Sequence, residues 1–368
     1  MIRAAAVVVV LFTTFTACAK PPPDGVYADL PFLDSTEGVD VNPEHIVLDM
    51  AAEGHRALPL MIDTGASFSV LTPGFAKQVG VSVRRTKNSP YRRKSALGRD
   101  VQFYVDTSSS DTGARSGWEI GVLGGNVLEK YTVEFDYVAR RVRFLDPRKH
   151  PVPKEPAHAG EIVVPVQIVG RRPYVVLNLG NGKASFLVDT GAPFDLELSE
   201  KTAVRLGISH EEGDIVEGSN AIGADRALVT EVDSVRIGDR EVGPSELKVT
   251  LADGSGWRHT NNAGRDEAVL AASFLNRFHV RIDYVHSRMS LVPLSAEERE
   301  KVVASLEGGA TQARKVIDWV PATVRLAKAG LDVTVIELGQ FRVDKAKAFG
   351  PGSKIGLRKG DVITNASG

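Results

Sequence analysis

The fold is decided by residues 58–71, which read Leu-Pro-Leu-Met-Ile-Asp-Thr-Gly-Ala-Ser-Phe-Ser-Val-Leu and have a close copy in residues 185–198. In each copy an apolar strand leads directly into Asp-Thr-Gly-Ala. This pattern places a carboxylate, Asp63 or Asp189, at the tip of a buried strand. The glycine that follows allows the chain to turn sharply at that point.

When equivalent turns bring two carboxyl groups close together, each group changes the ionisation of the other. Like charges a few ångströms apart cannot both ionise, so one carboxyl stays protonated and the other acts as a base. Such a pair can activate a water molecule against a peptide carbonyl.

A second repeat supports the first. Residues 122–137 align without a gap with residues 269–284, and both segments end in Asp-Tyr. The two aspartates are 126 residues apart, whereas the second pair of segments is offset by 147 residues. Duplication on this scale predicts two similar domains in one chain.

These motifs resemble the aspartic proteases, and the alanine after each Asp-Thr-Gly is more similar to the retropepsin-type branch than to the pepsin-like one. The resemblance covers residues 42–293. It implies a mainly β fold with two retropepsin-like (acid protease) β-barrel lobes in tandem. In that family an apolar-apolar-Gly segment threads behind each catalytic loop; Val122-Leu123-Gly124 matches it, while the second lobe has Ala271 in place of the glycine.

The resemblance implies an aspartic endopeptidase that acts on polypeptides and needs no cofactor. Asp63 and Asp189 would share a proton and hold the attacking water. The threonines would bond across the lobes, the glycines would bring backbone close to the carboxylates, and the alanines would leave the aspartates without the hydroxyl donor of pepsin-like members. These supporting residues are Thr64, Gly65, Ala66, Thr190, Gly191 and Ala192.

A third Asp-Thr-Gly-Ala begins at Asp111, but three serines precede it instead of an apolar strand. We therefore predict a loop there, outside the site.

The N-terminus is typical of an export signal. A short basic start is followed by about a dozen apolar residues, too few to span a bilayer, and Phe15-Thr-Ala-Cys18 resembles a bacterial lipobox. We expect a lipoprotein-type signal peptide over residues 1–17, lipid attachment at Cys18, and a protein of the bacterial envelope or periplasm held at the membrane. The alternative is ordinary signal-peptidase cleavage after Ala17-Cys18-Ala19, which has the small-x-small form.

The predicted domain order continues from that leader. The segments are a tether (18–41), lobe one (42–147), a Pro-rich linker (148–160), lobe two (161–293), a helical linker (294–323) and a partial PDZ domain (324–368). The linker helix should begin at a capping box on Ser295 and stop at Gly308-Gly309. Residues 351–363 resemble the middle of a bacterial PDZ domain, which would take a peptide or protein ligand if completed.

We predict a short helix over Phe75–Val79, opened by Thr72-Pro73-Gly74, and its counterpart over Ser199–Leu206, which ends at Gly207. A charged segment follows each helix, and the two segments have opposite charge. Residues 84–94 hold six basic side chains and no acid, and residues 211–217 hold four acidic ones. They are either solvated loops or flaps that select substrates or meet across the site.

Composition excludes other classes. With 43% apolar residues, 25% charged residues and a formal charge of −1, the chain is typical of a globular protein, expected to be a monomer without nucleic-acid binding. The eight histidines lack metal-site spacing, so no metal is expected. The competing hypothesis is a degenerate, non-catalytic protease fold that recruits peptide or envelope partners.

Overall fold

The computed structural model describes residues 24–33, 35–36, 39–40, 45–55, 57–78, 91–105, 121–208, 214–220, 223–251, 268–316, 323–326, 331–337, 340–346 and 362–363. The leader, Cys18 and the third Asp-Thr-Gly-Ala at Asp111 lie outside these residues, so their roles stay predictions. The chain divides into two units, Met1–Gly309 and Ala310–Gly368.

The first repeat, residues 42–147, forms a six-stranded sheet. Its strands in spatial order are β4 (Val47–Asp49), β5 (Pro59–Ile62), β9 (Gly121–Leu123), β6 (Val70–Leu71), β8 (Asp100–Val105) and β7 (Tyr91–Lys94). The pairs β5–β9 and β6–β8 are parallel, whereas β6 and β9 are antiparallel. Helices α1 (Pro73–Gln78) and α2 (Gly125–Leu128) follow β6 and β9.

The second repeat, residues 161–293, has the same strand order within a larger sheet. The equivalent strands are β14 (Arg172–Leu179), β15 (Gly182–Asp189), β22 (Ala268–Ala271), β16 (Leu196–Ser199), β21 (Ser245–Thr250) and β18 (Gly223–Val232). Its parallel pairs are β15–β22 and β16–β21, again with an antiparallel pair, β16–β22, between them. Helices α3 (Glu200–Arg205) and α4 (Ala272–Leu275) take the places of α1 and α2.

Further strands extend this second sheet. They are β13 (Gln167–Val169), β17 (Asp214–Asn220), β19 (Val235–Ile237) and β20 (Arg240–Val242). The β17–β18 hairpin contains the acidic Asp214 and Glu217, while β7 contains three of the six basic residues of the segment 84–94. The other charged residues of these two segments lie outside the described residues.

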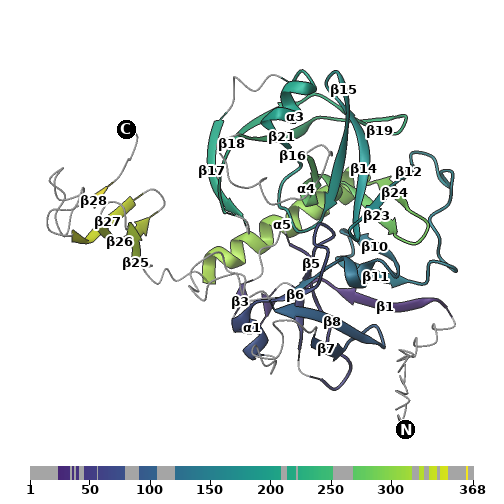
Figure 1. Ribbon diagram of the computed structural model, residues 1–368, viewed down its shortest axis with the longest axis horizontal. Helices are drawn as coiled ribbons and strands as arrows, with labels where there is room; N and C mark the ends of the chain where they lie inside the picture. The colour runs from purple at the N-terminus through teal and green to yellow at the C-terminus, as the bar shows by residue number, and fades with distance from the viewer. Residues whose placement is uncertain are drawn as a thin grey trace, which may run out of the picture. The chain divides into compact units, whose positions relative to one another are not determined.

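A third sheet joins the two repeats and lies between them in Figure 1. Its strands in order are β1 (Val26–Pro31), β11 (Arg141–Leu145), β10 (Thr132–Asp136), β23 (Phe278–Asp283), β24 (Arg288–Pro293) and β12 (Ile162–Pro165). The central pair brings together the duplicated strands that precede the Asp-Tyr pairs, with Thr132 opposite Asp283. The repeats therefore share a continuous hydrogen-bonded sheet.

Two segments differ from the sequence-based expectation. The tether expected over residues 18–41 contains β1, which pairs with β11 because Tyr27, Ala28 and Leu30 pack against the core. Helix α5 (Ala296–Val316) begins at the predicted Ser295 capping box but continues past Gly308-Gly309. Two glycines cost a helix only about 1 kcal/mol each, which the favourable residues around them offset.

The remaining described elements are short. Strands β2 (Ser35–Thr36) and β3 (Val39–Asp40) form a two-stranded ribbon. In the second unit, β25 (Thr323–Leu326), β26 (Leu331–Glu337), β27 (Gln340–Ala346) and β28 (Val362–Ile363) form an antiparallel sheet. Most of the PDZ-like segment lies outside the described residues, so that prediction stays open. No helix within the described ranges has the length and apolar character needed to cross a membrane.

Candidate active site

The two predicted aspartates lie at the ends of equivalent buried strands. Ile62 and Val188 are fully buried, and the aspartate that follows each is only partly buried. The backbone N–H of Asp63 donates to the carbonyl of Leu123 at 3.1 Å. Each carboxylate thus stands at the end of a buried strand and is itself only partly covered.

The threonines next to the aspartates tie the two repeats together. The hydroxyl of Thr64 donates to the carbonyl of Val188 at 2.6 Å, and the hydroxyl of Thr190 donates to the carbonyl of Ile62 at 2.8 Å. Each hydroxyl also accepts the backbone N–H of the other threonine, at 3.2 and 3.1 Å. These four buried bonds hold both strand ends in one register.

The glycines of the two turns face the carboxylate of the opposite repeat. A Cβ added to Gly65 would lie 2.4 Å from Oδ2 of Asp189, and one added to Gly191 would lie 2.8 Å from Cγ of Asp63. That second position is 3.0 Å from Oδ2 of Asp63 and 3.2 Å from Oδ1 of Asp189. The carboxylates therefore converge on one point, and a side chain larger than hydrogen would obstruct it.

Each carboxylate accepts a backbone donor from its own turn. The N–H of Ala66 donates to Oδ1 of Asp63, and the N–H of Gly191 donates to Oδ1 of Asp189, both at 2.8 Å. Neither Ala66 nor Ala192 has a hydroxyl that could add a second donor. The charged forms are therefore stabilised by backbone groups.

The surroundings raise the pKa values of both carboxyl groups. Burial raises the pKa of Asp63 well above its ordinary value, and the charge of Asp189 and a hydrogen bond to it raise that pKa further. Burial also raises the pKa of Asp189, but the N–H of Gly191, the bond with Asp63 and the charge of Arg172 oppose that rise. The pair thus retains a proton at a pH where isolated carboxyls are ionised.

The segments that thread behind the two Asp-Thr-Gly turns have the same backbone conformation, although one has a glycine and the other an alanine. Gly124 and Ala271 have nearly the same backbone angles, φ −109° and ψ −171° against φ −107° and ψ −179°. A Cβ on Gly124 would lie 2.5 Å from the carbonyl oxygen of Phe68, whereas the methyl of Ala271 is accommodated and fully buried. The replacement therefore leaves the second crossing intact.

Two further residues at the site were not identified from the sequence. His45 precedes β4 and hydrogen-bonds the backbone of Gly191 in the other repeat, while Arg172 begins β14 and acts on Asp189. The sequence holds a faint signal for them, because they are offset by 127 residues, close to the 126 that separate the aspartates. In the described part of the chain no cluster of three or more His, Cys, Asp or Glu could hold a metal.

Comparison with known proteins finds similarity to solved structures but not to a family model or a curated protein. No protein-family model matches the chain, and no curated protein matches it. One similar solved structure is a retropepsin-like aspartic protease from Rickettsia conorii, with 28% identity and a TM-score of 0.27 over 36% of this chain and 89% of that one. Another is basic 7S globulin from soybean, with 11% identity and a TM-score of 0.38 over 74% of this chain and 96% of that one. The chain is mainly β and compatible with an aspartic-protease-like fold.

Proposed function

We propose that this chain is an aspartic endopeptidase whose catalytic pair is Asp63 and Asp189. The observation that carries the proposal is the reciprocal bonding of Thr64 and Thr190, which brings one carboxylate from each repeat to a shared point. Fixed carboxylates with raised pKa values are suited to acid–base chemistry near neutral pH.

The chemistry needs only the pair and water. The ionised carboxylate takes a proton from water as the water oxygen bonds to the peptide carbonyl carbon, and the protonated carboxyl gives its proton to the carbonyl oxygen. The resulting diol breaks down when the newly protonated carboxyl gives its proton to the amide nitrogen and the C–N bond breaks. One diol hydroxyl then returns a proton to the other carboxylate, which restores the starting pair.

The supporting residues have separate tasks in this scheme. The threonines fix the distance between the carboxylates, and the glycines leave room for water and substrate between them. Since one chain supplies both halves, the site does not depend on dimer formation.

The proposed setting is the bacterial envelope, with export directed by residues 1–17 and lipid attachment at Cys18. Expression in a bacterial host with detergent partitioning tests this setting. Cys18→Ser should release the protein from the detergent phase or leave it unprocessed. A mature protein that begins at Lys20 would contradict lipid attachment.

A quenched peptide library tests the activity itself. The full chain should cleave a subset of the peptides, and a statine-type analogue of the diol should block that cleavage. The double variant Asp63→Asn/Asp189→Asn is the control, because it keeps the shape of the pair and removes its proton chemistry. Peptides that bind to both proteins and are cleaved by neither would favour the non-catalytic binding protein instead.

A further inference from the structure

Within each repeat, the strand register places one residue opposite the aspartate. Strand β14 pairs with β15 so that Tyr174 lies across from Leu187. Continued by two residues to the ends of both strands, this register would set Arg172 across from Asp189. Strand β4 pairs with β5 so that Val47 lies across from Met61. The same extension places His45 across from Asp63, and side chains opposite one another share a face of the sheet.

The two repeats therefore have different residues at equivalent positions, His45 opposite Asp63 and Arg172 opposite Asp189. Arginine is always charged in proteins, whereas a histidine titrates near neutral pH. Burial lowers the pKa of His45, and its bond to the Gly191 backbone only partly offsets this. The position opposite Asp63 is thus neutral when the position opposite Asp189 carries a positive charge.

Arg172 is held in place by the tight turn before it. Gly170 and Arg171 both have positive φ, 57° and 71°, between β13 and β14. This is the backbone of a two-residue hairpin turn. Arg171 reaches the first repeat, where its guanidinium lies 3.2 Å from Glu129 and 4.7 Å from the ring centre of Phe68. Anchored in this way, the hairpin fixes the start of β14 beside the carboxylates.

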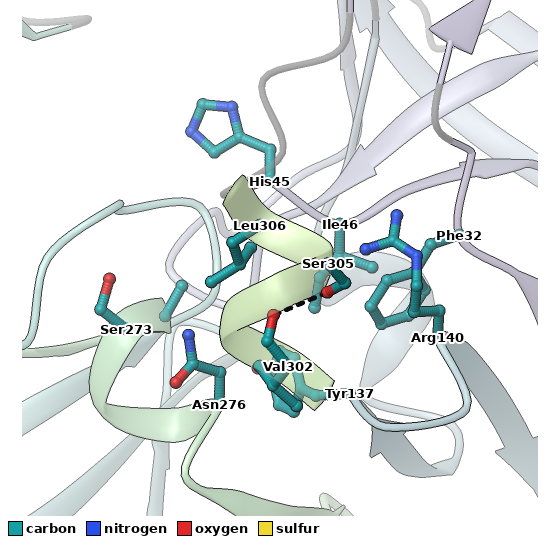
Figure 2. A pocket seen from close by; sticks show the side chains of 11 residues that line it. Phe32, His45, Ile46, Tyr137, Arg140, Ser273, Asn276, Val302, Ser305 and Leu306 are labelled. Carbon is teal, nitrogen blue, oxygen red and sulfur yellow. Dashed lines mark hydrogen bonds between the residues drawn. The ribbon is translucent and has the colours of Figure 1, made fainter. Parts of the chain in front are cut away.

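His45 is partly buried. It lines a cavity of about 50 Å³ between the repeats and helix α5, together with Ile46, Ser273 and Leu306. Figure 2 shows His45 at the rim of this group, away from Tyr137 and Arg140. A neutral imidazole suits such a place, because burial disfavours the charged form of a histidine.

We propose that the difference between His45 and Arg172 gives the pair a direction, because it decides which carboxyl is the base and which is the acid. Arg172 keeps the negative charge on Asp189, which acts as the base. Asp63 carries the proton and acts as the acid. The catalytic meaning of this assignment rests on the proposed function. Arg172 is a positioning residue for charge, since it acts through Asp189.

The other groups that face the pair are consistent with this direction. Burial raises the pKa of Tyr284, so its hydroxyl stays neutral. A hydrogen bond between the two carboxyls requires that one of them keep its proton. The difference in charge between the two sides of the pair therefore comes from Arg172 and His45.

Carbon-13 NMR of the full chain, labelled at aspartate carboxyls, tests the assignment without any need for turnover. The two signals are assigned by their loss in Asp63→Asn and Asp189→Asn. We expect Asp189 to ionise at lower pH than Asp63. Arg172→Gln should move the ionisation of Asp189 to higher pH, and Arg172→Lys should largely restore it. Arg236→Gln removes an exposed charge on the neighbouring strand β19, opposite Asn178, and should leave it unchanged.

Two outcomes would overturn the proposal: ionisation of Asp63 before Asp189 in the unmodified chain, or an ionisation of Asp189 that does not respond to Arg172→Gln. If that variant does not fold, His45→Arg gives the complementary test, since a cation opposite Asp63 should lower the pH at which Asp63 ionises. An unmoved Asp63 would count against the proposal. The expected titrations in a chain without peptidase activity would reject the proposed function and keep the charge assignment.

Discussion

Gly65 of the first repeat lies directly against the carboxylate of Asp189 in the second, so closely that a Cβ would fall 2.4 Å from Oδ2. Real Cβ atoms do not approach an oxygen so closely, and a buried pair has little room to shift. The two repeats are therefore complementary at the level of single atoms. This contact makes the glycine a sensitive position for testing the site.

Gly65→Ala should reduce both stability and peptide hydrolysis. Overpacking of this kind costs about 1–3 kcal/mol, and displacement of the carboxylate should slow turnover by about a hundredfold. Thermal unfolding and kcat/KM measure the two effects. Gly243→Ala is the matched control, because a Cβ there meets nothing within 4 Å and should change neither quantity. Equal behaviour of the two variants would show that the contact is not restrictive.

Thr64→Val should destabilise the junction of the repeats. The change keeps the size of the side chain but leaves the carbonyl of Val188 without its donor and the N–H of Thr190 without its acceptor. A buried group left unsatisfied costs about 1–3 kcal/mol. Urea unfolding should show this loss, and Thr64→Ser, which keeps the hydroxyl, should lose less. A valine variant as stable as the serine variant would contradict the account.

Asp63→Asn should change how stability depends on pH. The pKa of Asp63 is raised in the folded state, so the folded protein binds more protons than the unfolded chain between the ordinary value of 3.8 and the raised one. The free energy of unfolding therefore falls as the pH rises through that window. The amide removes this term, so the Tm of the variant relative to the unmodified protein should increase from pH 4 to pH 7.

Asp146→Asn provides a control of opposite sign. The hydrogen bond and charge of Arg148 lower the pKa of Asp146, so its contribution is present above the ordinary pKa and is lost as the pH falls. Relative to the unmodified protein, this variant should be least stable near neutral pH. If both variants shifted Tm in the same sense with pH, burial would not be what raises the pKa of Asp63.

Adding hydroxyls beside the carboxylates should move the pH profile of activity. In Ala66→Ser/Ala192→Ser, each new hydroxyl can donate to a charged aspartate and lower its pKa. A bond to a charged group is worth about 1.5–3 kcal/mol at most, which corresponds to a shift toward acid of about one to two pH units. The bell-shaped profile of kcat/KM reports it. Limbs that stay in place would show that another group controls ionisation.

The repeated segments predicted how the site is assembled, because they are local patterns. An apolar strand followed by Asp-Thr-Gly-Ala places the carboxylate, and the duplication implies that a second copy meets it. The short helices after β6 and β16 were also expected from their flanking prolines, glycines and caps. The bonds between Thr64 and Thr190 were inferred from the family resemblance, and the structure contains them.

Other features depend on contacts between segments far apart in the chain, which local sequence patterns do not predict. The positions of His45 and Arg172 follow from the register of two hairpins, which a one-residue shift would reverse. Strand β1 was missed because the Pro-rich start suggested a solvated tether, whereas its apolar residues find a partner in β11. The cost of Gly308 and Gly309 was overestimated, since helix α5 includes both.

Peptide hydrolysis by Asp63→Asn, Asp189→Asn and the double variant tests the central claim most directly. Each single variant should lose about a thousandfold in kcat/KM and remain folded, and the double variant should lose little more, because the two carboxyls act as one unit. Asp111→Asn should retain the full rate. Substantial activity in either single variant would contradict the account.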